Sequence, residues 1–476
     1  MKNCSSPSLK RDRTQRSLEE FQTKSIWDRA KRKRKSAPLF LGLLVFFVGL
    51  ALVLSGAGLA AESRGLSQED ANKTRASEEE TALQSQVLKL EAVLAYASEH
   101  NPSVQAARDR LLAAQERPAQ VSALDDPMFT YEGFNIPENF DLARTDNNIL
   151  KLSQKLPFPG KRRLRGEIAQ SEAAMIKEEL RMTEVVIRAE VKKAYYDLWQ
   201  IQQSLSIYAR EKELMAQFAI IAEKKYAVGL SAQPDVLRAQ VELTRLITRV
   251  TTETLKLGEA RAILNGLLSR PPETPLGIPQ DAPQPVVRQT LAELIELTLR
   301  VRPEIAARAA VIDRNTSTLA LAHKAYLPDF EVYAERFFNG HGRDGFGIIF
   351  SATIPLAYRQ KYDAGVAEAR AQLSAGKADL RAAQDKALTE VKSALVRTQI
   401  AAELTKLFTQ THIPQAEQSL ASSRISYQTG KIDFLSLIDS LRVVEQVHLE
   451  HLAAAADFEK AYADLERAVG QELPRQ

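Results

Sequence analysis

The side chains best suited to chemistry are few, and histidine comes first among them. The chain has six histidines, and two of them, His448 and His451, lie three positions apart in a segment with helical periodicity. Residues at that spacing share one face of a helix, where Glu445 and Glu450 could add carboxylate ligands. A tetrahedral metal site needs four ligands, and two histidines fall short of that number. The sequence therefore predicts a solvated helix surface here and no metal site.

Motifs for other kinds of catalysis are missing from the sequence. The only cysteine is Cys4, which rules out a disulfide framework, a cysteine-based zinc site and a CxxC redox motif. The chain has no GxxxxGKS or GxxxxGKT phosphate loop, no HExxH motif and no GxSxG motif. The glycine-rich segment 339–345, which includes His341, is followed by no helical pattern and predicts a loop without a phosphate site. We therefore expect neither an enzyme nor a cofactor.

Charge is unevenly distributed along the chain. Of 476 residues, 64 are Lys or Arg and 60 are Asp or Glu, which gives a formal net charge of +4. Residues 1–61 hold 12 of the basic and 4 of the acidic residues, so residues 62–476 carry a net charge of −4. The basic surplus therefore belongs to the N-terminal segment, and the body of the protein shows no charge pattern that indicates nucleic-acid binding.

Residues 1–61 have the parts of a secretory signal peptide. A basic region (1–38) precedes an apolar core (39–54), and small residues then lead to a cleavage site after Ala60 or Ala61. An uncleaved anchor is the alternative, because the apolar core and the small residues after it are together long enough to span a bilayer. We expect cleavage, since the small residues suit a processing enzyme and serve no purpose in an anchor.

Beyond a polar lead-in that we expect to be flexible (62–85), the chain repeats one plan twice. Four short motifs recur about 200 positions later: Asn101-Pro102-Ser103-Val104 as Arg302-Pro303-Glu304-Ile305, Leu156-Pro157-Phe158 as Ile354-Pro355-Leu356, Val191-Lys192-Lys193-Ala194 as Val391-Lys392-Ser393-Ala394, and Tyr226-Ala227-Val228-Gly229 as Tyr427-Gln428-Thr429-Gly430. A nearly constant offset over four motifs indicates a tandem duplication. We divide the chain into repeat 1 (86–270), a Pro-rich linker (271–288) and repeat 2 (289–471).

Each repeat has the order helix, β-hairpin, very long helix and returning helix. We expect these at about 86–118, 128–156, 161–227 and 234–269 in repeat 1, and at about 290–325, 329–355, 359–428 and 433–470 in repeat 2. Apolar residues in the long and returning helices of repeat 1 follow the steps of three and four of a coiled coil. Pro414 interrupts the second long helix where the first has Glu213, so the two should not be straight copies. The predicted fold class is mainly α with a small β part.

The predicted hairpins contain four strands of alternating apolar and polar residues. Such alternation suits a strand with one face in lipid and one in water, although a soluble hairpin alternates too. The first strand is less regular, and we expect a bulge near Gly133. Four strands are too few for a closed barrel, and open sheet edges are not tolerated in lipid. If these strands cross a membrane, several chains must pool them, and three chains would supply twelve strands, an even number within the range of known barrels.

Taken together, residues 86–471 resemble the TolC-like outer-membrane efflux proteins. The segments that carry the resemblance are Leu156-Pro157-Phe158-Pro159-Gly160-Lys161-Arg162-Arg163, Tyr226-Ala227-Val228-Gly229-Leu230, and residues 407–441 with Ile413-Pro414-Gln415-Ala416-Glu417. The resemblance implies a homotrimer in the cell outer membrane, with duplicated α-helical hairpins forming an α-barrel tunnel in the periplasm. Four strands per chain would contribute to a 12-stranded membrane β-barrel.

The resemblance also implies a passive export channel. Its partners would be a periplasmic adaptor (membrane fusion) protein, an inner-membrane transporter and outer-membrane lipid. The run from Leu156 to Arg163 is similar to the heavy-metal efflux branch, which makes metal cations or small organic toxins the expected cargo. A type I secretion conduit for polypeptides and a non-channel envelope coiled-coil protein are the alternatives. Lys161-Arg162-Arg163 would meet phosphate headgroups or line the junction between barrel and tunnel.

Finally, the resemblance places functional residues at the tips of the helical hairpins. The adaptor would dock at Val228, Gly229, Leu230, Gly430 and Lys431. Acidic residues just beyond the tips narrow the closed tunnel in the family and favour cations, and by position this role carries over to Asp439. The partner one turn earlier is Ser436 here, a departure that would thin an acidic ring, and Asp433 and Asp235 flank the tips and could compensate. The alternative for Asp439 is a solvated helix surface or an intrahelical pair with Arg442.

Overall fold

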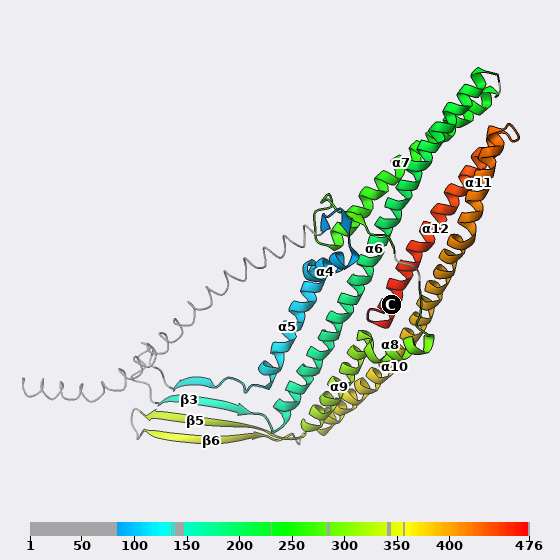
Figure 1. The fold of residues 1–476 in the computed structure, drawn as a ribbon. Helices are drawn as coiled ribbons and strands as arrows, with labels where there is room; N and C mark the ends of the chain where they lie inside the picture. The colour runs from blue at the N-terminus through cyan, green and yellow to red at the C-terminus, as the bar shows by residue number, and fades with distance from the viewer. Residues whose placement is uncertain are drawn as a thin grey trace, which may run out of the picture. The chain divides into compact units, whose positions relative to one another are not determined.

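In the computed structural model the described residues are 83–134, 136, 138, 147–229, 231–282, 286–339, 344–355 and 358–474. Residues Thr81–Gln476 form one compact unit, and Figure 1 shows its helices and strands. The predicted signal peptide, most of the predicted lead-in and His341 lie outside the described residues. Within the described ranges, none of the helices combines the length and the apolar character needed to cross a membrane.

The elements follow the same order in both repeats. Repeat 1 contains α4 (Leu90–His100), α5 (Pro102–Ser122), β2 (Met128–Phe134), β3 (Asn147–Leu156), α6 (Lys161–Ala227) and α7 (Gln233–Leu267). Repeat 2 contains α8 (Leu291–Val301), α9 (Pro303–Lys324), β5 (Asp329–Asn339), β6 (Gly345–Thr353), α10 (Arg359–Leu407), the π-helical turn η2 (Phe408–His412), α11 (Ile413–Gln428) and α12 (Phe434–Val469). The 67 residues of α6 make a rod of about 100 Å. The chain is mainly helical with a small β part, as predicted.

The first helix of each repeat is broken in two, which corrects the expectation of one helix over 86–118 and one over 290–325. The breaks fall at Asn101 and Arg302, each in an extended conformation directly before a proline. A residue before proline is pushed out of the helical region by the proline ring, and the proline is then well placed to begin the next helix. The Asn101 side chain also caps the second helix by accepting a hydrogen bond from Ser103 N (2.9 Å).

The two hairpins join into one antiparallel sheet of order β2-β3-β5-β6. The inner pair β3–β5 links the repeats over ten residue pairs, from Asn147 opposite Asn339 to Leu156 opposite Phe330. Register is unbroken between β2 and β3, with Gly133 opposite Asn148, so the predicted bulge near Gly133 is wrong. Figure 1 shows the four strands extending together from the ends of the helices.

A second, very small sheet lies beside the long helix and was not predicted. It pairs β1 (Val87–Leu88) in parallel with β4 (Ile278–Pro279), which belongs to the predicted linker. The Tyr195 hydroxyl of α6 fastens both strands, because it donates to Leu88 O (2.7 Å) and accepts from Gln280 N (2.9 Å). The start of repeat 1 and the linker are thereby attached to the middle of the first long helix.

The long helices of the two repeats differ, as the proline at position 414 predicts. α6 runs without interruption, whereas the predicted helix over 359–428 is divided into α10, η2 and α11. Pro414 lies at the start of α11 and has no N–H to donate. In the π-helical turn before it, the N–H of Ile413 bonds to Phe408 O, five residues back. This wider turn accommodates the hydrogen bond that Pro414 cannot make, and the helix continues into α11.

The long helices pack as a row. α7 packs on α6, α6 on α12, and α12 on α10 and α11, so that α7 and α10 are the outer members. α6 and α7 form helical hairpin 1, and α10 to α12 form helical hairpin 2. Near the tips of these helical hairpins, one buried cluster joins the two. Its largest fully buried side chains are Met215, Leu246, Phe434 and Leu437. This shared core holds the two tips close enough for their polar groups to interact.

Candidate functional site

Both hairpin tips turn on a glycine. Gly229 has φ 77° and Gly430 has φ 73°, backbone conformations that side chains with a β-carbon rarely adopt. The N–H of Lys431 bonds to Ser426 O (2.8 Å) and completes the second turn. Val228 is 68% exposed at the first tip. Of the predicted docking residues, Leu230 lies outside the described part of the chain.

The helices that leave the two tips begin differently. Asp433 caps α12, because its carboxylate accepts hydrogen bonds from the backbone N–H of Ser436 (3.1 Å) and from the Ser436 hydroxyl. These bonds hold the pKa of Asp433 below its ordinary value. α7 begins after Ala232, which offers no side-chain cap, and Asp235 instead accepts a hydrogen bond from Ser231 Oγ (2.8 Å). Asp433, Ser436 and Asp235 therefore order the helix starts, a role that the sequence analysis did not assign to them.

The two tips touch each other through Lys225 and Tyr427. Lys225 Nζ donates to the backbone oxygen of Tyr427 (2.9 Å) and lies 4.0 Å from the centre of its ring. The ring in turn packs on Phe434, with ring centres 5.5 Å apart. Burial, together with the nearby charge of Asp235, raises the pKa of Tyr427. A cation–π contact and a hydrogen bond thus tie repeat 1 to repeat 2 at the point where both helices reverse.

Asp439 lies on the surface of α12, with its side chain 59% exposed. Its nearest cation is Arg442, one turn along the helix, at 3.6 Å. Arg442 makes a much closer contact with Glu242 of α7 (2.7 Å). Asp439 is therefore only loosely paired, and most of its side chain is open to solvent.

One turn beyond Asp439, a cluster of four charges bridges α7 and α12. Glu242 accepts from Arg442 and Arg245, and Arg245 also donates to Glu445 (2.6 Å). Burial opposes ionisation of Glu242, yet the two arginines hold its pKa below the ordinary value. The sequence analysis missed this cluster. The signal that could have found it is the repeat offset of 200, which places Glu242 opposite Arg442 and Arg245 opposite Glu445 with the charges exchanged.

The four-stranded sheet has one apolar and one polar face. Phe346, Ile348 and Phe350 alternate along β6 on the apolar face and are 71–81% exposed in the single chain. Besides Asp329, which pairs with Lys161, the polar face carries three carboxylates and two lysines: Glu132, Glu331, Glu335, Lys151 and Lys155. Tyr333 donates to Glu331 (2.6 Å), and the Glu335 carboxylate occupies space above Gly347 that a β-carbon would fill.

The basic run at the end of β3 divides into buried and exposed residues. Lys161 is buried, and its Nζ donates to Asp329 Oδ1 (2.8 Å) and Leu327 O (3.0 Å). It therefore fastens the start of α6 to the start of β5, which corrects the expectation that it meets headgroups or lines the junction. Arg162 donates to Ser122 O (2.7 Å), and Arg163 is exposed beside Glu167.

The histidines of α12 make separate contacts. His448 lies 3.2 Å from a carboxylate oxygen of Glu417 on α11, and His451 lies 3.1 Å from Thr409 Oγ1. Burial and the neighbouring His448 lower the pKa of His451. Over the described ranges, no group of three or more His, Cys, Asp or Glu side chains is arranged to hold a metal ion.

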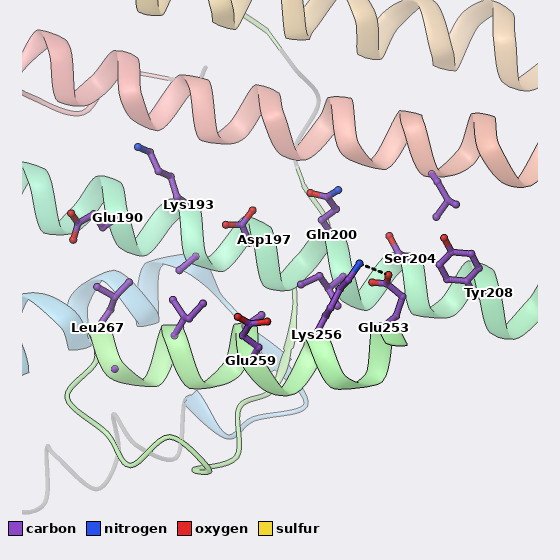
Figure 2. Close-up of a pocket in the computed structure, with 16 residues that line it drawn as sticks. Glu190, Lys193, Asp197, Gln200, Ser204, Tyr208, Glu253, Lys256, Glu259 and Leu267 are labelled. Atoms are coloured by element: carbon purple, nitrogen blue, oxygen red, sulfur yellow. Dashed lines mark hydrogen bonds and ion pairs between the residues drawn. The ribbon is translucent and has the colours of Figure 1, made fainter. Parts of the chain in front are cut away.

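A hollow of about 920 Å³ lies mainly between α6 and α7 (Figure 2). Its charged lining consists of four carboxylates and two lysines: Glu190, Asp197, Glu253, Glu259, Lys193 and Lys256. Lys256 is bound to Glu253 at 2.8 Å, the pair that Figure 2 marks. The hollow is therefore negatively lined, and its floor is apolar, with Ala194, Ile201 and Ile263 among its residues.

A family model described as outer membrane efflux protein matches residues 93–264 and 294–471. The chain belongs to the outer membrane efflux protein family. The two matched segments lie one in each repeat. Membership confirms the predicted localisation in the outer membrane and the prediction that the chain is not an enzyme.

Individual proteins resemble the chain in sequence or in fold. The chain is 21% identical over 384 residues to the cobalt-zinc-cadmium resistance protein CzcC of Cupriavidus metallidurans, covering 81% of this chain and 90% of that protein. The outer membrane protein VceC of Vibrio cholerae has the same fold, with a TM-score of 0.67 and 18% identity over 80% of this chain and 96% of VceC. CusC gives a TM-score of 0.69 and 17% identity, over 80% of this chain and 92% of CusC.

Proposed function

We propose that this protein is a homotrimeric outer-membrane channel that passively conducts metal cations out of the cell. It receives them from an inner-membrane pump through a periplasmic adaptor. The observation that carries the proposal is the sheet, in which β2 and β6 are edge strands without a partner among the described strands of the chain. Lipid cannot satisfy the free N–H and C=O groups of such edges, so neighbouring copies must. Three copies supply twelve strands, an even number that can close.

The outer helices support the same assembly. α7 and α10 lie at opposite ends of the helix row, and both present exposed apolar side chains away from the chain. On α7 these include Ile247 and Leu255, and on α10 Ile400, Leu404 and Leu407. Contiguous exposed apolar surface of this kind marks an interface. Packing α7 of one copy against α10 of the next buries both faces and continues the row into a ring.

Metal cations are the cargo that the charges favour. The polar face of the sheet, which would line the barrel, carries three carboxylates against two lysines, and three copies multiply that excess. A lining with a net negative charge raises the local concentration of cations. The relative CzcC is named for resistance to cobalt, zinc and cadmium, all divalent cations.

The tips are the proposed periplasmic entrance. Val228, Gly229, Leu230, Gly430 and Lys431 would contact the adaptor, and three copies of Asp439 would form the narrow, cation-attracting ring. The exposed, loosely paired Asp439 carboxylate supports that role. Ser436 and Asp433 contribute less, because they are engaged with each other at the start of α12.

Single-channel recording in planar bilayers tests the proposal. The purified protein should form cation-selective pores that divalent or trivalent cations block from the side of the tips. Asp439→Asn should weaken that block about tenfold or more, because it removes three charges from one ring. Asp379→Asn, an exposed aspartate on α10, is the matched control and should leave the block unchanged. A folded protein that is strictly monomeric in detergent would contradict the channel, and unchanged block in Asp439→Asn would contradict the gate.

A further inference from the structure

Glu211 of α6 is a buried acid that the channel proposal does not use. It is 8% exposed, and its Oε2 atom is fully buried without a hydrogen-bond partner among the described residues. Burying a carboxylate without partners costs several kcal/mol when it is ionised and much less when it is protonated. Its position therefore favours the protonated form of the Glu211 carboxyl over the ionised form.

The groups that face Glu211 come from all three helices around it. Glu445 of α12 repels its negative charge, while Arg245 of α7 and Arg210 of α6 attract it. Burial is the largest influence, followed by Glu445, and together they raise the pKa of Glu211 to about 7. Its protonation therefore changes near neutral pH.

Two of these neighbours belong to the charge cluster that bridges the hairpins. In that cluster, two carboxylates (Glu242, Glu445) balance two guanidinium groups (Arg245, Arg442). Ionised Glu211 adds a third carboxylate, which repels Glu445 and competes with it for Arg245.

The bridging cluster matters because α7 and α12 meet directly over only a short stretch, although both also pack on α6 through the shared buried core. A groove of about 360 Å³ separates them on the tip side of the cluster. Apolar side chains line the groove from both helices: Leu237, Val241, Leu435 and Ile438. The salt bridges therefore supply the direct polar link between α7 and α12, in addition to the buried core that both helices share with α6.

We propose that Glu211 is a proton-operated switch between the two hairpins. When protonated, it leaves the bridge between α7 and α12 intact, and when ionised, it loosens that bridge and lets the tips separate. An acid whose pKa is raised in the closed arrangement stabilises that arrangement at low pH, where the acid is protonated. This stabilisation of the closed arrangement is lost as pH rises through neutrality and Glu211 ionises. The consequence for conduction rests on the proposed function, because tip separation would widen the entrance.

Histidine is the other group that titrates near neutral pH, so its position must be considered. The two histidines of α12 face away from the cluster toward other partners, His448 toward Glu417 and His451 toward Thr409. Burial lowers the pKa of His451. A pH response that survived the removal of Glu211 would have to come from such residues, and this outcome would overturn the proposal.

The switch can be tested by measuring the distance between α7 and α12. Spin labels on Thr248→Cys and Val443→Cys, both exposed positions, report that distance by pulsed electron paramagnetic resonance. The background is the full chain with Cys4→Ser, folded with an excess of unlabelled chain so that each label pair belongs to one molecule. Between pH 5.5 and 8.5, the labelled protein should shift from a short to a longer distance with a midpoint near neutral pH. The population ratio should change by at most about tenfold per pH unit.

Matched variants separate the possible outcomes. Glu211→Gln should keep the short distance at every pH, and Glu213→Gln, the same change at an exposed position two residues on, should behave like the parent. Glu211→Met is the second variant if Glu211→Gln fails to fold, as judged by circular dichroism and size-exclusion chromatography. A pH shift that persists without Glu211, or no shift in the parent, would refute the switch. The distance can be measured whether or not the protein conducts, so failure of the channel proposal would show separately, in the bilayer recordings.

Discussion

The two helical hairpins come from one ancestral plan, yet one is a continuous rod and the other contains an interruption. In hairpin 1, α6 holds 67 helical residues without a break. In hairpin 2, a π-helical turn and Pro414 divide the equivalent rod. An uninterrupted helix transmits a displacement along its length, whereas a π turn is a place where backbone bonds can rearrange. The two repeats therefore differ in where their long helices can rearrange: within hairpin 2 at the π turn, and at no equivalent position in hairpin 1.

A second difference between the repeats lies deep in the helix row. Lys192 of α6 is 5% exposed and bonds to Glu466 of α12 (2.5 Å), which is 6% exposed. Its counterpart in the repeat, Lys392, lies exposed on α10. The duplicated lysine thus became a buried link between hairpins in one copy and a surface residue in the other.

The largest expected effect comes from breaking that link. Lys192→Met leaves the Glu466 carboxylate buried without its cation and should lower the free energy of unfolding by about 3–5 kcal/mol. Lys392→Met should change it by less than about 0.5 kcal/mol, as surface substitutions usually do. Thermal or denaturant unfolding in detergent, followed by circular dichroism, measures both. Equal effects of the two substitutions would contradict the assignment of a structural role to Lys192 alone.

The next largest effect comes from changing which of the two long helices carries the proline. Glu213→Pro places a proline in α6 at the position equivalent to Pro414, and it should cost about 3 kcal/mol or more, because α6 has no π turn to accommodate it. Pro414→Ala should stay within about 1 kcal/mol, since the regained hydrogen bond offsets the lost stiffness of the unfolded chain. The same unfolding measurement compares them. If α6 tolerated Glu213→Pro as well as hairpin 2 tolerates Pro414, the rods would not differ in the way described.

The smallest effect concerns the helix starts at the tips. Ala232→Asp gives α7 the cap that Asp433 gives α12, and it should raise stability by about 1 kcal/mol. Asp433→Ala should lower it. Because hydrogen bonds from Ser436 lower the pKa of Asp433, its contribution is present at neutral pH and is lost as pH falls through that lowered pKa. The parent and Asp433→Ala should therefore converge in stability in acid, and a difference that persisted there would exclude capping as its cause.

Much of the fold could be read from the sequence, because its signals are periodic and repeated. Apolar spacing indicated the long helices, alternation indicated the four strands, and Pro414 indicated the break in hairpin 2. The breaks at Asn101 and Arg302 were missed even though a proline follows each, because the helical pattern continues on both sides. The regular pairing of Gly133 was missed because an irregular pattern of side chains can accompany a regular backbone.

The candidate site was less predictable, because it depends on contacts between distant residues. Asp433, Ser436 and Asp235 were singled out for their charge or position, yet short-range hydrogen bonds at the helix starts engage all three. The bridge from Arg245 to Glu445 and the burial of Glu211 arise where three helices meet. No local pattern marks such a meeting point, since it is fixed by tertiary packing.

The pairing of β1 with β4 bears on the order in which the chain acquires its structure. Both strands, and the Tyr195 hydroxyl that fastens them, lie within the first 280 residues. Because synthesis begins at the N-terminus, β1, β4 and Tyr195 can come together before any of repeat 2 is available. The β2–β3 hairpin can also pair at this stage, but the other edge of β3 stays unpaired until β5 has been made. Repeat 1 should therefore fold first around Tyr195, and its sheet should be completed only after β5 of repeat 2 has been synthesised.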